Sequence, residues 1–349
     1  MMKKKSLISI ALCLGVYCVC TGFKNNENIA SITTTEINSG SHHELTNVHD
    51  YIQVDRIVPQ VPPVGEKLNI ILDTDLANEI DDLYAVALLL ASPDRFNIKG
   101  FVASHFNHNN ARSGPASIDT SFDLLKELLA KAECEDKYPI YRGSHPSGYY
   151  NYPSESEGVD FIIKTARSCT PEDPLWVVAL GAATDLASAI LIAPDIAPNV
   201  RFVFHARSEY SWPERSMQFN VYANIFAART ILKKWVPLVW FDTGTNLKCD
   251  YSLTEKYLKP CGELGHFLHH YRDRNPYFNN DKGFFDLGDI AFLINPDICK
   301  MEVVNAPTMD NYMFFDHEQQ ANGKMLRVYD IDNNATWNMF FERMKIFKK

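Results

Sequence analysis

One stretch, residues 68–90 with the sequence LNIILDTDLANEIDDLYAVALLL, most constrains what this chain can fold into. It opens with an apolar run at 70–72 that predicts a buried strand, and it closes with an apolar segment long enough for a helix. The acidic side chains between them are Asp73, Asp75, Glu79, Asp81 and Asp82. A strand, an acidic loop and a helix in this order are typical of α/β folds, which bind ligands at the carboxyl ends of their strands.

These carboxylates indicate a divalent-cation site. Like charges a few ångström apart raise one another's pKa unless a cation lies between them. Several hard oxygen ligands without Cys or His suit Ca²⁺ or Mg²⁺ better than zinc. The simpler alternative is that Asp81 and Asp82 only cap and charge the first turn of the helix. One carboxylate would suffice for that role, and Asp73 and Asp75 lie at the strand end, so we favour the metal site.

The first residues predict an exported protein. Lysines at 3–5 precede an apolar run at 7–19, which is too short to span a membrane and predicts a signal peptide over residues 1–22. The protein would then be periplasmic, membrane-anchored or extracellular. Cys20 lies where a lipoprotein signal places its acylated cysteine, but the residues before it fit a lipobox poorly, so a lipid anchor stays an open alternative. The polar and Pro-containing composition of residues 23–65 predicts a disordered tether.

The remaining residues, 66–349, fit one large domain of ordinary globular composition. The formal net charge of −9, with Lys and Arg scattered, argues against nucleic acid or an anionic membrane as partner. A neutral or weakly charged small molecule is easier to accommodate. The cysteines beyond the signal region are widely spaced and form no CxxC pair, so they predict buried small residues or one optional disulfide.

Segments that predict strands alternate with segments that predict helices in this domain. The expected strands are 70–72, 97–103, 139–143, 175–180, 200–205, 238–241, 302–304 and 326–329. The expected helices include 117–132, 159–168, 184–193, 218–234, 266–271 and 289–293. This alternation predicts the α/β class, with a mainly parallel central sheet flanked by helices on both faces.

The order of the motifs resembles the nucleoside hydrolase family, calcium-dependent enzymes that cleave the N-glycosidic bond of ribonucleosides. Its signature is an aspartate pair DxD followed by DDxxA, which stands here as Asp73-Thr74-Asp75 and the run 81–85, with two more residues between the halves than in the best-known members. Further landmarks follow in order: GFVASHFN at 100–107, PIYRG at 139–143, VALGAATDLA at 178–187, QFN at 218–220 and FDLGDIAFLINP at 285–296. The resemblance covers about residues 68–296.

This resemblance implies a set of metal ligands and a general base. Asp75, Asp82 and Asp286 would bind the calcium through their carboxylates, and Leu180 through its backbone carbonyl. Asp75 would also act as general base toward a water whose pKa the metal lowers. That water would attack the anomeric carbon through an oxocarbenium-like transition state.

The resemblance also implies the substrate contacts. Asp81, Asn107 and Asn220 would hold hydroxyl groups of the ribose. The expected substrate is a nucleoside or a related riboside, and family members are commonly dimers or tetramers, so we expect a homo-oligomer.

The chain departs from the family pattern at positions that bear on the substrate. Gln218 replaces a glutamate, so it can bind a hydroxyl but offers no negative charge. Trp212 replaces an asparagine and could stack on a base, although simple loop packing is as frequent. Phe285 replaces a histidine that protonates the departing base in many members. His269, on a predicted helix with His266 and His270 on the same face, could supply that acid, although a helix surface without a role fits equally.

Two other functions compete with the hydrolase. A non-catalytic, calcium-dependent nucleoside- or sugar-binding protein is favoured by the departures at Gln218, Trp212 and Phe285. A phosphatase of the haloacid dehalogenase type is suggested by the run IILDTDL at 70–76, but DDxxA follows too soon and no basic residue stands in a convincing phosphate-binding context.

Overall fold

A computed structural model of the protein describes residues 56–106, 115–146, 148–233, 236–318 and 322–348. Residues 52–349 form one compact unit. The expected signal peptide and Asn107 lie outside the described residues. Among the helices that are described, none is both long enough and apolar enough to cross a membrane.

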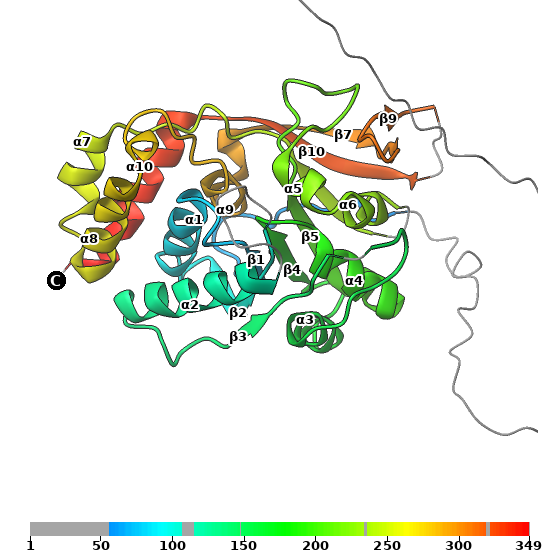
Figure 1. Ribbon diagram of the computed structural model, residues 1–349, viewed down its shortest axis with the longest axis horizontal. Coiled ribbons are helices and arrows are strands. Elements are labelled where there is room, and N and C mark those ends of the chain that lie inside the picture. Colours follow the sequence, from blue (N-terminus) through cyan, green and yellow to red (C-terminus); the bar gives the residue numbers. More distant parts are fainter. Residues whose placement is uncertain (1–55, 107–114, 147, 234–235, 319–321, 349) are drawn as a thin grey trace, which may run out of the picture. The chain divides into compact units, whose positions relative to one another are not determined.

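The centre of the domain is an eight-stranded sheet (Figure 1). Its strands are β1 (Leu68–Thr74), β2 (Phe96–Ala103), β3 (Ile140–Arg142), β4 (Leu175–Ala179), β5 (Val200–His205), β6 (Leu238–Phe241), β7 (Cys299–Asn305) and β10 (Lys324–Ile331). Two short strands, β8 (Thr308–Met309) and β9 (Phe315–Asp316), form a separate hairpin-like pair. Every residue of β1, β4, β5 and β6 is buried, as expected for strands covered on both faces.

The strand order is β3-β2-β1-β4-β5-β6-β10-β7. All neighbouring pairs are parallel except β10 and β7, which are antiparallel. The order reverses between β1 and β4, because successive connections run outward from this pair in opposite directions. In open α/β sheets such a switch point leaves a crevice at the carboxyl ends of the two strands, where ligands bind.

Helices cover both faces of the sheet. They are α1 (Asp81–Leu90), α2 (Pro115–Lys131), α3 (Glu157–Arg167), α4 (Thr184–Ile192), α5 (Phe219–Ala223), α6 (Ile225–Ile231), α7 (Tyr251–Leu253), α8 (Gly262–Tyr271), α9 (Leu287–Ile294) and α10 (Asn333–Met344). Short helical turns lie at Pro194–Asn199, Thr254–Leu258, Arg272–Arg274, Pro276–Phe278, Pro296–Ile298 and Lys345–Phe347. One apolar core contains α1, α2, α8, α9 and α10, and the other contains α3, α4 and α6 (Figure 1).

Helix α1 lies in the middle of the first core. All ten of its residues are buried, and it packs against α9. A helix that is apolar all round must be covered on every side, and the sequence DDLYAVALLL leaves only its first turn polar. The core therefore fixes α1 and holds its two N-terminal aspartates at the sheet edge.

The structure confirms the α/β class and a mostly parallel sheet flanked by helices, with β5 and β6 as predicted. The helix predicted at 218–234 is instead divided at Asn224, whose backbone has φ −152° and ψ 86°. The Asn224 side chain accepts from the Ala227 amide at 3.1 Å and donates to Thr184 at 2.9 Å. This side-chain capping starts a new helix, α6, because Asn competes for backbone hydrogen bonds.

The C-terminal part of the expected tether lies against the domain. Arg56 is buried and donates to the carbonyls of Val236 and Ile231 at 2.5 and 3.2 Å. Arg95 donates to the carbonyls of Pro62 and Pro63, both at 2.7 Å. Arg56 thus donates from this segment to carbonyls of the domain, and Arg95 donates from the domain to carbonyls of this segment, so residues 56–65 belong to the domain rather than to a tether.

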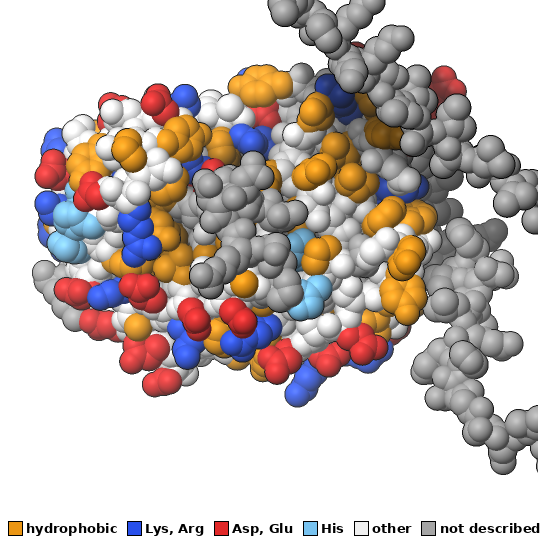
Figure 2. Space-filling model, viewed as in Figure 1, with side chains coloured by type: hydrophobic (Ala, Val, Ile, Leu, Met, Phe, Trp, Pro, Cys, Tyr) orange, Lys and Arg blue, Asp and Glu red, His pale blue; other side chains and the backbone are white. Residues whose placement is uncertain are grey.

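The surface carries both signs of charge. Figure 2 shows acidic and basic side chains interspersed on the face in view. This mixture agrees with the scattered Lys and Arg in the sequence.

Candidate active site

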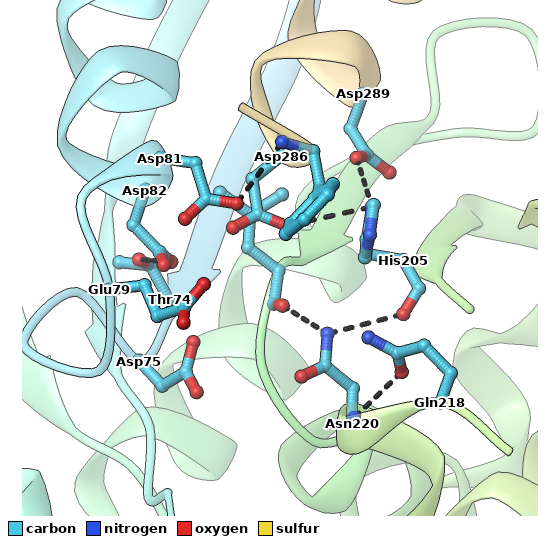
Figure 3. Close-up of polar contacts among 12 residues, drawn as sticks. Thr74, Asp75, Glu79, Asp81, Asp82, His205, Gln218, Asn220, Asp286 and Asp289 are labelled. Carbon is cyan, nitrogen blue, oxygen red and sulfur yellow. Dashed lines mark hydrogen bonds and ion pairs between the residues drawn. The ribbon is translucent and has the colours of Figure 1, made fainter. Parts of the chain in front are cut away.

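A pocket of about 250 Å³ lies at the carboxyl ends of the central strands. It is lined by Asp75, Asn78, Glu79, Asp81, Asp82, Leu180, His205, Arg207, Gln218, Phe219, Asn220, Tyr277, Phe285 and Asp286. Asp75 follows β1 and Leu180 follows β4, so the pocket occupies the crevice at the switch point of the strand order. Figure 3 shows Asp75, Glu79, Asp81 and Asp82 on one side of the site and His205, Asp289, Gln218 and Asn220 on the other.

The loop after β1 and the first turn of α1 supply most of the carboxylates. Asp75, Asp81 and Asp82 are each about 2 % exposed. Thr74 donates its hydroxyl hydrogen to Asp82 at 2.5 Å, and the Asn78 amide donates to Asp75 at 3.1 Å. These bonds orient the carboxylates, because each fixes one oxygen and leaves the other available.

Asp286 reaches the same site from the other end of the domain. It directly precedes α9, and the packing of α9 on α1 brings it to the first turn of α1. Oxygens of Asp81, Asp82 and Asp286 all lie within 4.8 Å of one another (Figure 3). The structure thus brings two of the predicted ligands, Asp82 and Asp286, together with Asp81, while Asp75 lines the same pocket outside this group.

The carboxyl groups raise one another's pKa. Burial, followed by the charges of Asp82 and Asp81, holds the pKa of Asp75 well above its usual range. Burial, followed by the charges of Asp81 and Asp82, does the same to Asp286. Burial and the charge of Asp81 raise the pKa of Asp82 to about 7. Such a cluster is costly to ionise alone, so its chemistry fits a bound divalent cation.

Asp81 differs from the other acids because it has a cationic partner. The Lys282 ammonium lies 2.8 Å from Asp81 and 2.6 Å from Glu79, and its side chain is fully buried. Burial acts to raise the pKa of Asp81, but the charge and hydrogen bond of Lys282 outweigh it and lower that pKa. Lys282 was not predicted from the sequence, because a single lysine in a loop carries no signal of its partners.

A second polar group lies beside Asp286. The Nδ1 atom of His205 is 2.7 Å from Asp289 and 3.5 Å from Asp286. Burial raises the pKa of Asp289 to about 6, although the His205 contact opposes the shift. In the structure Asp289 therefore holds His205. His205 itself was missed, because it ends a buried strand like any other residue of the sheet.

Gln218 and Asn220, expected to bind ribose, both line the pocket. The Gln218 side-chain oxygen caps α5 by accepting from the backbone of Asn220 and Val221, at 2.7 and 3.2 Å. The Asn220 amide donates to the carbonyls of Leu180 and His205. The Leu180 carbonyl therefore faces the pocket with one acceptor direction used, and a carbonyl has a second lone pair for a metal.

Two residues expected at the substrate lie outside the pocket lining. Trp212 packs between Phe315 and Arg327, with a ring-centroid distance of 5.2 Å to the first and 4.5 Å from its ring to the guanidinium of the second. His269 is buried in α8, where its Nδ1 lies 3.0 Å from the Thr254 hydroxyl. Both side chains are used in packing, so the structure does not bring them to the acidic site. Asn107 lies outside the described residues.

Comparison with known proteins gives a consistent match. The sequence model described as inosine-uridine preferring nucleoside hydrolase matches residues 70–338. The non-specific ribonucleoside hydrolase RihC of Shigella dysenteriae is 24% identical over 260 residues, which cover 68% of this chain and 82% of that protein. A probable uridine nucleosidase 2 of Arabidopsis thaliana is 30% identical over 155 residues, 39% of this chain and 46% of the relative.

Solved structures agree with these sequence matches. The purine-preferring ribonucleoside hydrolase from Gardnerella vaginalis superimposes with a TM-score of 0.63 at 15% identity, covering 80% of this chain and 99% of that chain. At 15% sequence identity, this similarity shows the fold alone. The family match over most of the domain, in contrast, leaves the haloacid dehalogenase alternative without support.

Proposed function

The chain belongs to the inosine-uridine preferring nucleoside hydrolase family and is an N-glycosyl hydrolase, and from this premise we propose that it hydrolyses ribonucleosides or related N-ribosides in a Ca²⁺-dependent reaction. The products are the free base and ribose. One observation carries the proposal: Asp75, Asp82 and Asp286, buried and with raised pKa values, line one pocket at the switch point of the sheet. A site that gathers so much negative charge is suited to a divalent cation and to stabilising a cationic sugar.

The proposed cation site consists of oxygen atoms only. Asp75, Asp82 and Asp286 would hold the ion with their carboxylates, and Leu180 with its carbonyl, which is the donor set that Ca²⁺ prefers. When bound, the ion supplies Lewis-acid activation of water and a binding point for sugar hydroxyls. It also favours the ionised form of the three carboxyl groups, which offsets their mutual repulsion.

Asp75 is the proposed general base. The Asn78 amide fixes one oxygen of its carboxylate at 3.1 Å and leaves the other to face the pocket. As the oxygen of a water attacks the anomeric carbon, Asp75 takes a proton from that water, and the bond from the anomeric carbon to the base nitrogen breaks with its electron pair going to the nitrogen. The remaining carboxylates stabilise the positive charge that develops on the sugar.

Asp81 is the proposed acceptor for a ribose hydroxyl. Lys282 keeps it ionised, and the Phe285 amide donates to it at 3.1 Å. An ionised carboxylate held from two sides accepts a sugar hydroxyl with little loss of side-chain freedom. Gln218 and Asn220, which also line the pocket, would contact the same sugar.

The test is Asp75→Asn, compared with the exposed carboxylate substitution Asp195→Asn outside the pocket. An amide cannot accept a proton, so we expect Asp75→Asn to lower kcat for inosine and uridine by about 10²–10⁴-fold. Asp195→Asn should retain the parent rate. Calorimetry should show that Asp82→Ala and Asp286→Ala weaken Ca²⁺ binding. Parent-like hydrolysis by Asp75→Asn would refute its role, and unchanged Ca²⁺ affinity in both alanine variants would refute the metal assignment.

A further inference from the structure

Cleavage of an N-glycosidic bond needs a group that stabilises the departing base. The electron pair of the broken bond goes to the base nitrogen, so negative charge develops on the base as positive charge develops on the sugar. Carboxylates cannot serve there, because they repel that charge. The aromatic side chain of Phe285, which stands where the family pattern has a histidine, has no proton to give.

Arg207 is the one Lys or Arg side chain among the described residues that line the pocket. It follows β5, and its backbone has a positive φ of 28°. Its amide donates to the Phe241 carbonyl at 3.1 Å. The next residue, Ser208, donates its hydroxyl hydrogen to Asp242 at 2.6 Å. The backbone that carries Arg207 is therefore fixed to the ends of two neighbouring strands.

The guanidinium of Arg207 is oriented by an aromatic ring. Its central carbon lies 3.8 Å from the ring centroid of Phe285. Its Nε atom is buried without a hydrogen-bond partner, and no carboxylate within the described part of the chain forms an ion pair with it. A guanidinium packed on one face by a ring keeps its N–H groups directed outward in its own plane. Arg207 thus presents unused donors at the pocket.

The ring of Phe285 also ties Arg207 to the reacting end of the site. The Phe285 amide donates to Asp81, and Asp286 is the next residue along the chain. Arg207 therefore packs on the ring of Phe285, and the backbone of Phe285 contacts Asp81, one of the carboxylates that would hold the sugar. The pocket has an acidic side for the sugar and a cationic side for the group attached to it.

We propose that Arg207 is a catalytic residue that donates hydrogen bonds to the departing base. The proposal rests on the hydrolase function given above. As the bond from the anomeric carbon to the base nitrogen breaks, the electron pair stays on the base, and Arg207 stabilises the resulting anion without giving up a proton. Arginine remains protonated throughout the usual pH range, so the base receives its proton from solvent after the bond has broken.

The other donors of the pocket are less suited to this role. The Asn78 and Asn220 amides are used on Asp75 and on backbone carbonyls. His205 is held by Asp289 through Nδ1, but its Nε2 is buried without a hydrogen-bond partner, so it is one competing candidate, and His205→Gln tests it directly. Tyr277 lines the pocket and is 43% exposed, so its hydroxyl is the other competing candidate, and Tyr277→Phe tests it directly.

The experiment compares uridine with 4-nitrophenyl riboside in the parent, Arg207→Gln and Arg207→Lys. The nitrophenolate ion leaves without help, whereas the uracil anion needs stabilisation. We expect Arg207→Gln to lower kcat/KM for uridine by about 10²–10³-fold, in the range seen on removing one donor to a developing anion. The nitrophenyl riboside should change by less than about fivefold. Arg207→Lys should recover part of the uridine activity, since it restores the charge but not the planar group.

Three further measurements separate catalysis from packing. Arg142→Gln is the matched control, since its guanidinium lies 4.0 Å over the ring of Phe122 outside the pocket, and it should leave both substrates at parent rates. Added guanidinium ion should restore uridine hydrolysis by Arg207→Ala. The alkaline limb of a titrating acid should be absent from the parent pH profile with uridine.

Three outcomes would overturn the inference. Equal losses on both substrates would make Arg207 a packing or binding residue, and a selective uridine loss in Tyr277→Phe with none in Arg207→Gln would assign the role to the tyrosine. Both leave the proposed function standing, because the parent hydrolyses both ribosides. A parent that hydrolyses neither substrate with Ca²⁺ would instead refute the proposed function and this inference together.

Discussion

Asp81 and Asp82 are neighbours in the first turn of α1, yet the pKa values of their carboxyl groups shift in opposite directions. Both are buried, and burial raises the pKa of each. Only Asp81 has the Lys282 ammonium at 2.8 Å, which outweighs burial and lowers its pKa. Lys282 thus keeps Asp81 ionised, whereas Asp82 has no such partner among the described residues and needs another cation to stay ionised.

The substitution Lys282→Met tests this division. It leaves the Asp81 carboxylate buried without its partner, so we expect the free energy of unfolding to fall by about 3–5 kcal/mol. The double variant Lys282→Met/Asp81→Asn should recover most of that stability but not the affinity for ribosides. Lys300→Met, which removes an exposed ion pair of 2.9 Å with Asp330, is the control and should scarcely change stability. Urea unfolding measures all three, and equal effects of Lys282→Met and Lys300→Met would contradict the argument.

At the scale of elements, the ends of β5 and β6 are joined to β10 beside the pocket. Asp242 directly follows β6, and its carboxylate accepts from Ser208 after β5 and from Arg327 in β10, the latter at 2.6 Å. Arg327 also contacts Glu302 in β7 at 2.7 Å. These bonds fix the loop that carries Arg207, so the wall of the pocket depends on charges behind it.

Removing the shared carboxylate should loosen this wall. Asp242→Ala leaves Arg327 largely buried without its main partner, and we expect a loss of about 3–5 kcal/mol in the free energy of unfolding. Asp242→Asn keeps an acceptor for Ser208 and should lose less. Glu302→Gln is the control, because that carboxylate is 44% exposed and contributes little. Thermal or urea unfolding measures these losses. An unfolding midpoint of Asp242→Ala equal to that of the parent would show that the ion pair is dispensable.

Across the whole molecule, the acidic site makes stability depend on pH and on the cation. In the metal-free protein the pKa values of Asp75, Asp82 and Asp286 lie above the ordinary carboxyl value, so the folded state binds more protons than the unfolded state. The free energy of unfolding then decreases as pH rises from about 4 to 7 and beyond, because protons that stabilise the fold are lost. A cation that binds the ionised carboxylates opposes this loss, and competes with protons below pH 7.

We therefore expect the rise in Tm on adding Ca²⁺ to grow between pH 5 and pH 8. At a free concentration of 100 Kd the ion should contribute about 2.7 kcal/mol. Asp82→Asn removes one repelling charge and one ligand, so it should raise the Tm measured in a chelator at pH 8 and reduce the shift caused by Ca²⁺. Scanning calorimetry at both pH values checks this. A Ca²⁺ shift that is the same at pH 5 and pH 8 would show that these carboxylates are not the site.

The sequence alone determined the α/β class, most strands and helices, and the acidic segment between β1 and α1. Local sequence patterns predict these features, namely apolar runs of strand length, helical periodicity, and acids within a few residues of one another. Asp286 was reachable only through the family resemblance of its segment. The division of the helix at Asn224 and the end of the tether were missed, because side chains of Asn and Arg redirect backbone hydrogen bonds that local patterns do not record.

The tertiary structure decided which distant side chains meet. Lys282, His205 and Arg207 have no distinctive neighbours in sequence, and they reach the site because α9 packs on α1 and because β5 lies next to β4. Other tertiary contacts hold His269 and Trp212 outside the pocket. The partners of a charge set its pKa and its use, and those partners follow from strand order and helix packing rather than from the residues beside it in the chain.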